Sequence, residues 1–355
     1  RLVGAEMCIR DRGLRCRRAM AEHRGDFPAN GSQPTRYTCN DPQAAVHLHE
    51  RGYVVFDSVI SPAECEQALN HFWDWIGEVT GERVVRGWLE SYRHWPPALD
   101  RGAILAYCGI GQSEFCWGVR DRPKVRKAFS TLWQEDDLLV SFDGACVMRP
   151  WHYEPSWKSH ESWFHVDQHP GQRPGFDCIQ GLVNLLPMDS DGACNQLIEG
   201  SHHVFSDYAR RYPETVAALP VDEDYFELPT DDPVISDPSV TPMQILLRPG
   251  DMLCWDSRTA HCSSPGSSGQ AVDNSHQLSR AAVFVCMVPR TKANDTLIKT
   301  RKKAVSLQVT TTHRPHVYNP THKYSDWRIR LRRGDTLPYP AHPATLTAAR
   351  RKLIG

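Results

Sequence analysis

The clearest pattern of apolar and polar positions in this chain is a helical repeat in its first quarter. The repeat follows Ser61-Pro62-Ala63-Glu64, where a serine and a glutamate three residues apart form a capping box with proline at the first helical position. The apolar residues that recur at helical spacing are Ala68, Leu69, Phe72, Trp73 and Ile76. We therefore predict a helix that runs to about Val79.

Shorter signals on either side of this helix predict further elements. Residues 41–52 (DPQAAVHLHERG) are typical of a short helix that ends at a glycine, and residues 53–56 (YVVF) have the composition of a strand. Residues 113–135 predict one or two helices, broken near Pro123. Helices are therefore expected to dominate the first third of the chain.

The pattern changes at Leu138 to short apolar runs separated by glycine and proline turns. The predicted strands are 138–142, 145–149, 163–167, 178–186, 195–198, 244–247, 252–255 and 280–288. Short strands joined by such turns are typical of a sandwich or barrel, so we predict an α+β protein with an all-β core. The acidic, proline-rich residues 206–241 predict a surface insertion or lid.

Composition limits the class of protein further. The chain has 355 residues, 40% of them hydrophobic, and no run of 18 apolar residues, so we predict one large core and no membrane span. Its 12 cysteines include no CxxC pair, which favours free thiols and an intracellular, cytoplasmic location. The final residues KLIG are not a peroxisomal signal.

Charge is distributed unevenly along the chain. Residues 290–355 carry 15 lysines and arginines against three acidic residues, although the formal net charge is only −1. We expect this basic part to be a helical extension on an acidic body, and we expect no nucleic-acid site because aromatic residues are not interleaved with the basic ones.

The domain organisation follows from these patterns. We predict a single domain over residues 26–355, and its parts are N-terminal helices at 40–137, a β core at 138–290, the insertion at 206–241 and a basic extension at 291–355. Residues 1–25 are arginine-rich and lack the apolar core of a secretory signal, so we predict a disordered or non-native segment there. The sequence does not indicate the oligomeric state.

The stretch WFHVDQHP, residues 163–170, places His165, Asp167 and His169 at alternating positions. Alternate residues of a strand share one face, so all three side chains are candidates to bind one metal ion. His-x-Asp alone is a weak signal, because a chain with 17 histidines is expected to contain about one such motif by chance.

A remote histidine makes this motif more specific. His261 follows the apolar run 252–255, 96 residues after His165, whereas the alternative third ligand, His276, lies in a polar loop. Two imidazoles and one carboxylate are the donor set of a mononuclear non-haem Fe(II) site, which leaves coordination positions for a bidentate cosubstrate and O2. We therefore predict His165, Asp167 and His261 as the metal ligands.

A buried cation is predicted near this set. Arg280 opens the apolar run AAVFVCMV, 19 residues after His261. The distal carboxylate of 2-oxoglutarate is planar, and arginine binds such a group through two parallel hydrogen bonds. We therefore expect Arg280 to bind 2-oxoglutarate.

The order of these motifs resembles that of the phytanoyl-CoA dioxygenase family of Fe(II)- and 2-oxoglutarate-dependent oxygenases, over residues 50–290. The motifs are GYVVF at 52–56 with the capped helix after it, His165-x-Asp167, Gly200-Ser201-His202, Arg248-Pro249-Gly250-Asp251, His261 and Arg280. The resemblance implies a double-stranded β-helix (jelly-roll, cupin-like) core with N-terminal helices packed on one sheet. It also implies a dioxygenase that uses Fe(II), 2-oxoglutarate and O2 to hydroxylate a small organic or acyl-type substrate, releasing succinate and CO2.

The resemblance also implies roles for individual residues. The implied catalytic iron ligands are His165, Asp167 and His261, and the implied cosubstrate-binding residues are Arg280, Ser263, Met148 and Gln180. Leu182 stands where some members carry a tryptophan, which is a departure from the pattern. Related halogenases have a small residue at the position of Asp167, so a carboxylate there favours hydroxylation.

Two other functions compete with this interpretation. A differently metallated cupin-like hydrolase, with zinc on the same three ligands, has no need of Arg280. A non-catalytic binding protein of the same fold has no need of the complete set of three metal ligands and Arg280. The remaining histidines are expected to have other roles: His169 at the pocket rim or surface, His202 and His203 in structure, and His313, His316 and His322 at the surface. His152 and His160 are candidates to line a substrate mouth.

Overall fold

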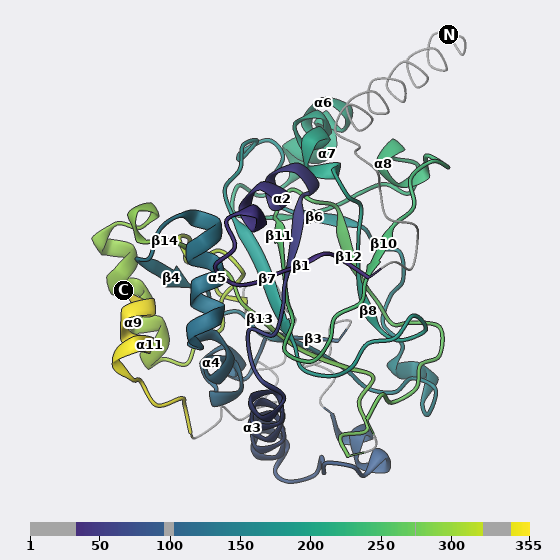
Figure 1. Cartoon of the computed structure of the whole chain (residues 1–355), viewed down its shortest axis with the longest axis vertical. Helices are drawn as coiled ribbons and strands as arrows, with labels where there is room; N and C mark the ends of the chain where they lie inside the picture. Colours follow the sequence, from purple (N-terminus) through teal and green to yellow (C-terminus); the bar gives the residue numbers. More distant parts are fainter. Residues whose placement is uncertain (1–32, 96–102, 274, 322–341) are drawn as a thin grey trace.

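The computed structural model describes residues 33–95, 103–273, 275–321 and 342–355 (Figure 1). The predicted N-terminal segment 1–25 lies outside the described residues, and so does His322. Among the described helices, none has the length and hydropathy needed to span a membrane.

Helices precede the main run of strands, follow it and interrupt it. They are α2 (Gln43–Arg51), α3 (Pro62–Thr80), α4 (Glu114–Arg120), α5 (Pro123–Trp133), α6 (Tyr208–Arg211), α7 (Pro213–Ala218), α8 (Pro233–Ser236), α9 (Asp295–Ser306) and α11 (Ala348–Ile354). The predicted capping box starts α3, because the Ser61 hydroxyl accepts the Glu64 N–H while the Glu64 carboxylate accepts the Ser61 N–H. Gly81 ends the same helix at a positive φ of 61°.

Most strands belong to two sheets. The larger sheet has the order β1-β2-β11-β7-β13-β5-β3, with β1 (Arg36–Tyr37), β2 (Tyr53–Phe56), β11 (Met252–Asp256), β7 (Ile179–Asn184), β13 (Arg280–Phe284), β5 (Ala145–Met148) and β3 (Ile104–Leu105). The smaller sheet has the order β10-β8-β12-β6-β9, with β10 (Met243–Ile245), β8 (Cys194–Leu197), β12 (His261–Ser264), β6 (His165–Asp167) and β9 (Tyr225–Glu227). A separate pair joins β14 (Met287–Pro289) to β4 (Leu138–Val140).

The two sheets pack face to face around a layer of apolar side chains. Leu182, Leu253 and Trp255 from the larger sheet form one buried cluster with Leu197 and Ile245 from the smaller sheet. Alternate residues of a strand point to opposite faces, so one face of the larger sheet lines the interior of the sandwich. Polar side chains on this face are therefore held between the sheets.

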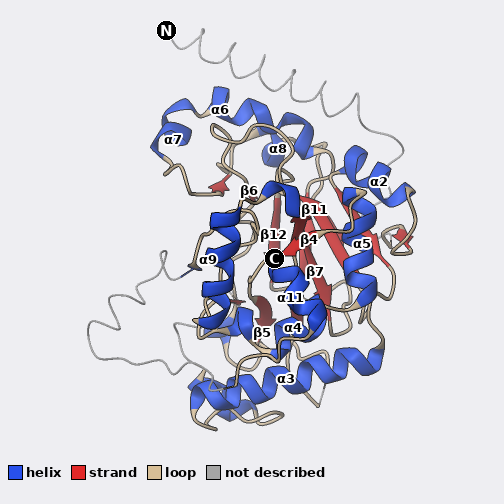
Figure 2. Cartoon of the chain, turned by 90° about the vertical axis from the view of Figure 1, so that its left-hand side faces the viewer, coloured by secondary structure: helices blue, strands red, loops and turns tan. Residues whose placement is uncertain are grey.

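The helices of the first third cover the opposite face of the larger sheet. Val183 and Val283 of that face belong to the same buried cluster as Phe72 of α3, Trp117 of α4 and Phe129 of α5. Figure 2 shows these helices beside the strands of the larger sheet. The arrangement is the predicted one, an α+β fold with N-terminal helices packed on one sheet of a double-stranded β core.

Three features of the fold were not predicted. The first part of the chain contributes β1 and β3 as well as the predicted β2 to the larger sheet. The run 280–288 is divided into β13 and β14, which belong to different sheets. The acidic insertion contains β9, which pairs with the metal-motif strand β6, so part of this segment belongs to the smaller sheet.

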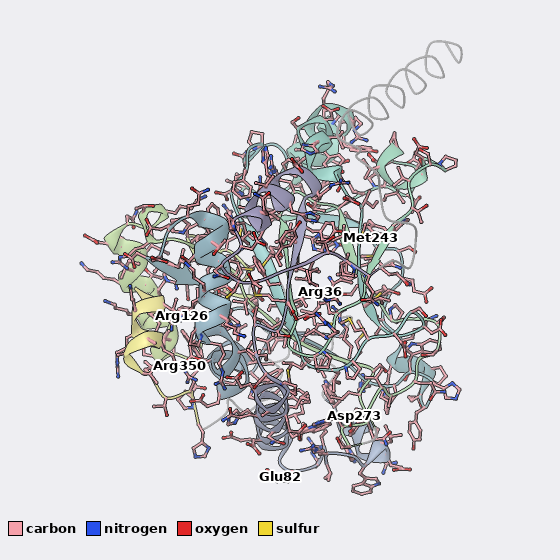
Figure 3. The ribbon with its side chains drawn as sticks, in the orientation of Figure 1. Arg36, Glu82, Arg126, Met243, Asp273 and Arg350 are labelled. Atoms are coloured by element: carbon pink, nitrogen blue, oxygen red, sulfur yellow. The ribbon has the colours of Figure 1, made fainter. Side chains whose placement is uncertain are left out.

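The basic C-terminal part is joined closely to the body of the protein. Arg350 of α11 donates to Asp121 at 2.7 Å and to Glu114 at 2.8 Å (Figure 3). The segment before the undescribed residues runs along the β core, where the Thr311 N–H donates to the Phe142 carbonyl at 2.8 Å. Residues 307–321 are therefore a structural part of the core region and help to form the site described next.

Candidate metal centre

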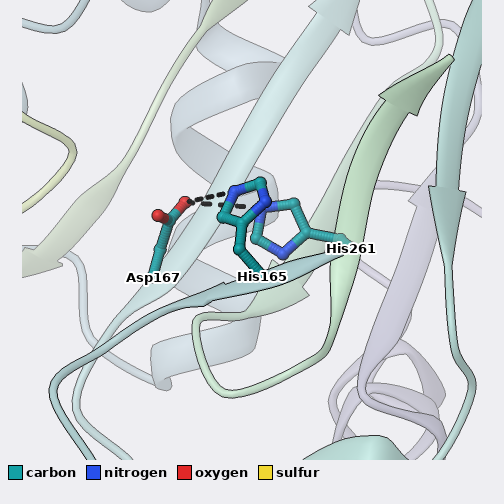
Figure 4. Close-up of side chains that lie close together, drawn as sticks. All are labelled: His165, Asp167 and His261. Carbon is teal, nitrogen blue, oxygen red and sulfur yellow. Dashed lines mark ion pairs between the residues drawn. The ribbon is translucent and has the colours of Figure 1, made fainter. Parts of the chain in front are cut away.

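Two neighbouring strands of the smaller sheet bring the predicted metal ligands together. β12 pairs antiparallel with β6, and His261 lies directly opposite His165 in the register. Asp167 lies two residues after His165 and so on the same face of β6. One face of this strand pair therefore carries all three side chains (Figure 4).

The donor atoms of this group lie close enough to share one ion. One donor atom from each of His165, Asp167 and His261 lies within 4.8 Å of the other two. The Asp167 Oδ2 is 3.4 Å from the Nε2 of His261 and 3.7 Å from the Nε2 of His165. His165 and His261 are buried, and Asp167 is half-buried.

Backbone carbonyls fix the orientation of both imidazoles. The Nδ1 of His165 lies 3.1 Å from the Trp163 carbonyl, and the Nδ1 of His261 lies 2.9 Å from the Thr259 carbonyl. A carbonyl can only accept, so each Nδ1 carries the proton and each Nε2 keeps its lone pair. The lone pairs point toward Asp167, which is the tautomer that a metal ligand requires.

The electrostatics of the group keep its donors in the forms that bind metals. Burial, followed by the neighbouring His165, lowers the pKa of His261, so its ring is neutral at physiological pH. Burial raises the pKa of Asp167, but its imidazole neighbours, His165 first and then His261, outweigh it and hold this pKa well below its usual range. The site therefore presents a neutral His261 imidazole and an ionised Asp167 carboxylate.

Arg280 lies between the two sheets without a carboxylate partner. Its side chain is 1% exposed, and it donates to the Cys194 carbonyl and the Ser263 Oγ, each at 3.2 Å, and to the Asn195 Oδ1. Among the described residues, no acidic side chain pairs with Arg280, and its Nε has no hydrogen-bond partner. A buried, uncompensated guanidinium is costly and fits an anionic ligand that the protein binds from solution.

Two further buried donors share the inner face of the larger sheet. Gln180 of β7 lies opposite Trp255 of β11, and within the described part of the chain neither the Gln180 Nε2 nor the Trp255 Nε1 has a hydrogen-bond partner. The Trp255 ring centroid lies 5.1 Å from that of His261. Unpaired N–H groups beside the metal-ligand candidates again fit a ligand rich in acceptor oxygens.

The other predicted cosubstrate residues lie near Arg280. Met148 of β5 is the register partner of Arg280, and Ser263 is in hydrogen-bond contact with it. Sequence reasoning missed Asn195 and Trp255, which complete this region. Neither belongs to a recognisable motif, and only the pairing of distant strands brings them to the site.

The alternative third ligand, His276, belongs to a different part of the molecule. Its Nδ1 accepts the Trp73 Nε1–H at 2.9 Å, and its Nε2 lies 3.0 Å from the Glu66 carboxylate. It is buried against α3 and is not a member of the group formed by His165, Asp167 and His261. His276 therefore has a structural role in the helical layer.

His169 is buried rather than placed at the rim or surface. It is 2% exposed, and its Nδ1 accepts the backbone N–H groups of Gly171 and Gln172. The expectation of a surface position was wrong because this histidine caps the turn that follows β6. His202 and His203 bond to backbone carbonyls of α2, at His49 and Glu50, which agrees with a structural role.

The histidines of the C-terminal segment correct another expectation. His313 and His316 were expected at the surface, but the side chains of both are at most 9% exposed. The His313 Nε2 donates to the Asp167 carbonyl at 3.0 Å, and His316 contacts the Asp177 carboxylate at 3.1 Å. The segment folds back onto the site, which its basic, proline-containing sequence does not reveal.

A cavity of about 600 Å³ opens beside the candidate ligands. His165 and Asp167 line it together with Trp163, Tyr225 and His313. His160 also lines it, as expected for a substrate mouth, whereas His152 is not among the lining residues. A volume of this size can hold a small organic molecule next to the metal-binding group.

Comparison with known proteins identifies the family. The sequence profile of the phytanoyl-CoA dioxygenase family matches residues 48–271. This chain belongs to the phytanoyl-CoA dioxygenase family. Membership confirms the family predicted from the sequence, and it supports an oxygenase activity with iron and 2-oxoglutarate as cofactors.

Individual relatives agree with this placement. The chain is 26% identical over 276 residues to Ava biosynthesis cluster protein O of Aspergillus versicolor, covering 76% of this chain and 84% of that protein. It is 28% identical over 122 residues to a putative phytanoyl-CoA dioxygenase of Dictyostelium discoideum, covering 34% of each chain. The solved structure of GlcNAc Inducible Gene 2 from Candida albicans superposes with a TM-score of 0.56 at 13% identity, covering 98% of this chain and 90% of that chain. This last likeness concerns the fold alone.

Proposed function

We propose that this protein is an Fe(II)- and 2-oxoglutarate-dependent dioxygenase that hydroxylates a small organic or acyl-type substrate and releases succinate and CO2. The observation that carries the proposal is the clustering of His165, Asp167 and His261, whose donor atoms lie within 4.8 Å of one another in a chain of this family. In the balanced reaction, one atom of O2 enters the substrate as hydroxyl and the other enters succinate.

The chemistry of the site fits both cofactors. Two imidazole nitrogens and a carboxylate suit Fe(II), and the fixed Nδ1 protons of His165 and His261 leave the correct nitrogens free. The buried guanidinium of Arg280, whose Nε has no hydrogen-bond partner among the described residues, suits the distal carboxylate of 2-oxoglutarate. A hydrolytic zinc enzyme would gain nothing from this buried cation.

Each residue of the site would then have a separate role. His165, Asp167 and His261 would hold Fe(II), which when bound supplies the redox chemistry that couples oxidation of 2-oxoglutarate to oxidation of the substrate. Arg280 and Ser263 would orient the cosubstrate, and Met148 and Gln180 would line its pocket. The apolar layer between the sheets would exclude water from this region. Asp167 fills the position that a halide would need, which supports hydroxylation.

The test is the coupled loss of 2-oxoglutarate and gain of succinate. Purified protein loaded anaerobically with Fe(II) should bind 2-oxoglutarate in a calorimetric titration and should form succinate after admission of O2, slowly without substrate. Zn(II) in place of Fe(II) should permit binding and give no succinate. If the iron-loaded protein neither binds 2-oxoglutarate nor forms succinate with a broad substrate panel, the proposal is wrong.

A further inference from the structure

The acidic insertion contributes directly to the wall of the cavity. β9 pairs antiparallel with β6, so Tyr225 lies opposite Asp167 and Glu227 lies opposite His165. Directly opposed residues point to the same face of a sheet, which is here the face of the candidate metal ligands. The rings of His165 and Tyr225 have centroids 4.8 Å apart, and both residues line the cavity with Glu227.

The acidic side chains of this wall are not balanced by basic ones among the described residues that line the cavity. Asp167, Glu223, Asp224 and Glu227 line the cavity, whereas no lysine or arginine is among its lining residues in the described part of the chain. The negative charge of Asp224 is compensated, because this residue forms salt bridges with Arg173 and Arg314. Asp167 belongs to the metal-binding group. The two remaining carboxylates, Glu223 and Glu227, therefore determine the charge of the cavity wall.

Among the described residues, the hydrogen bonds found for these two carboxylates are with neutral groups. The Glu223 Oε1 accepts the backbone N–H groups of Asp224 and Tyr225, at 3.1 and 3.0 Å. The Glu227 Oε2 accepts the Tyr225 hydroxyl at 2.9 Å. These bonds fix both side chains in position without cancelling their charge, so each carboxylate can still attract a cation.

Aromatic rings accompany the carboxylates. Tyr107, Trp163 and Tyr225 line the same cavity, and aromatic faces attract organic cations. Tyr225 is 37% exposed, whereas His165 is 5% exposed, so the acidic and aromatic wall extends outward from the buried metal-binding group. The wall and two of the candidate iron ligands, His165 and Asp167, line one cavity.

We propose that the substrate is a small organic cation, an ammonium compound with an apolar body. This inference rests on the proposed function, because it names the class of molecule that this same oxygenase site binds. The cationic group would lie against Glu223, Glu227 and the ring of Tyr225, and the apolar body would extend toward His165 and Asp167. An anionic acyl-CoA would meet like charges along this wall.

The basic C-terminal part does not change the charge of the described wall. Its pocket-lining residues are Thr312, His313, Asn319 and Thr321, which present hydroxyl, imidazole and amide groups. These four residues include no lysine, arginine, aspartate or glutamate, so the carboxylates of the described wall are those named above.

The first experiment compares three probes of the same shape. Binding of 3-phenylpropylamine, 3-phenylpropanol and 3-phenylpropionate to the full chain is measured by calorimetry and by saturation-transfer NMR, with and without Fe(II) and 2-oxoglutarate. We expect the amine to bind about tenfold more tightly than the alcohol, a preference that weakens with added salt, and we expect the carboxylate to bind most weakly. No amine binding, or equal or tighter binding of either other probe, would overturn the proposal.

The second experiment locates the preference. Glu227→Gln and Glu223→Gln remove one charge each and keep an oxygen that can accept the same hydrogen bonds. Each should lower the amine affinity about fivefold and leave the alcohol affinity unchanged. Glu214→Gln is the matched control, because this exposed residue of α7 lies in the same insertion and is not among the lining residues. If Glu214→Gln loses the preference for the amine over the alcohol while the two cavity variants keep it, the cation does not bind at Glu223 and Glu227.

The two proposals fail separately. The amine preference is read by binding to the protein without iron, whereas the dioxygenase assignment is read by succinate formation. If the protein prefers the amine but forms no succinate, it binds cations and the proposed dioxygenase activity is wrong. If the protein forms succinate but does not prefer the amine, it is a dioxygenase and the proposed class of substrate is wrong.

Discussion

At the scale of single residues, the protonation of two imidazoles decides which of their nitrogens can bind a metal. Each Nδ1 donates to a carbonyl two residues earlier in the chain, so the backbone of each histidine's own strand region selects the Nε2 tautomer. The site needs no additional side chain for this purpose. We therefore expect substitutions of the ligands themselves to have large effects on metal binding.

The third ligand can be tested with a pair of histidine variants. His261→Ala should lower Fe(II) affinity by more than the roughly 10- to 100-fold typical of an outer-shell mutation, because it removes a donor. His276→Ala should keep Fe(II) binding and lower the free energy of unfolding by about 1–3 kcal/mol, because it leaves the Trp73 Nε1–H without its acceptor and removes one partner of the Glu66 carboxylate. Anaerobic iron titration and urea denaturation measure the two effects. The reverse result would make His276 the ligand.

The second residue-scale prediction concerns Arg280. Arg280→Ala should raise the 2-oxoglutarate concentration needed for half-maximal succinate formation about 10- to 100-fold, since hydrogen bonds to charged groups contribute about 1.5–3 kcal/mol each. Iron binding should not change. Ser263→Ala is the graded control, and its effect should be smaller because the hydroxyl carries no charge. An unchanged 2-oxoglutarate requirement in Arg280→Ala would exclude this arginine from the cosubstrate site.

Sequence reasoning reached some site residues and not others for a physical reason. His165, Asp167 and Arg280 carry local signals, namely alternation on a strand and a charge at the start of an apolar run. Glu227 and His313 carry none, because their place beside the ligands depends on the pairing of β9 with β6 and on the return of the C-terminal segment. Such long-range contacts have no short sequence pattern.

At the scale of elements, a buried ion network joins the C-terminal segment to the acidic insertion. The Arg314 guanidinium, 5% exposed, contacts both Asp224 beside β9 and Asp177 before β7. Burial raises the pKa of Asp177, but His316, Arg314 and Lys292 outweigh it and hold this pKa well below its usual value. The network holds two walls of the cavity in a fixed relation.

Removing the centre of this network should be costly. Arg314→Ala should lower the free energy of unfolding by about 3 kcal/mol, because it removes a cation shared by two partly or fully buried carboxylates. Lys303→Ala, at an exposed position of α9, is the matched control and should change it by less than about 0.5 kcal/mol. Urea denaturation at neutral pH makes the comparison. If Arg314→Ala and Lys303→Ala change the free energy of unfolding by the same small amount, the ion network does not contribute to stability.

The turn that carries His202 should make the fold sensitive to acid. Burial lowers the pKa of His202 to about 4, whereas an unfolded histidine titrates near 6.5. Between these values the unfolded chain binds a proton that the folded chain does not, so stability falls as pH falls through this window. From pH 7 to about 4.5 the wild type should lose about 2 kcal/mol more than His202→Gln in urea denaturation. Parallel pH profiles would contradict this.

Elements with their own local pattern were predicted well. The capped helix α3 and the strand β2 were found at the expected residues because capping chemistry and β-branched content act locally. β9 was missed because its acidic surroundings resemble a surface loop, and its strand conformation depends on the edge of the smaller sheet. The division between β13 and β14 was missed because one continuous apolar run contains no sign of it.

At the scale of the whole molecule, we propose that residues 26–355 behave as one domain. Arg301 of α9 donates to carbonyls of Val140, Pro315, Leu353 and Ile354, which joins the β core to the last helix. Early strands, late strands and both ends of the described chain thus contribute to common buried clusters.

A truncation tests this proposal. A chain that ends at Ser306 should unfold at a markedly lower temperature than the full chain or fail to fold, because it lacks three of the four carbonyl partners of Arg301 and the buried Leu353 and Ile354. The full chain should show one transition by both circular dichroism and tryptophan fluorescence. Two separated transitions in the full chain, or unchanged stability after truncation, would indicate independent units.

The return of the C-terminal segment to the cavity has a consequence for the order of events during synthesis. His313, which bonds to the backbone of Asp167, lies 52 residues after His261 and leaves the ribosome later, by roughly 3–10 s at ordinary translation rates. For that interval the nascent chain carries every candidate iron ligand but lacks one wall of its pocket. We expect that stable capture of iron by a new molecule waits until this last wall is in place.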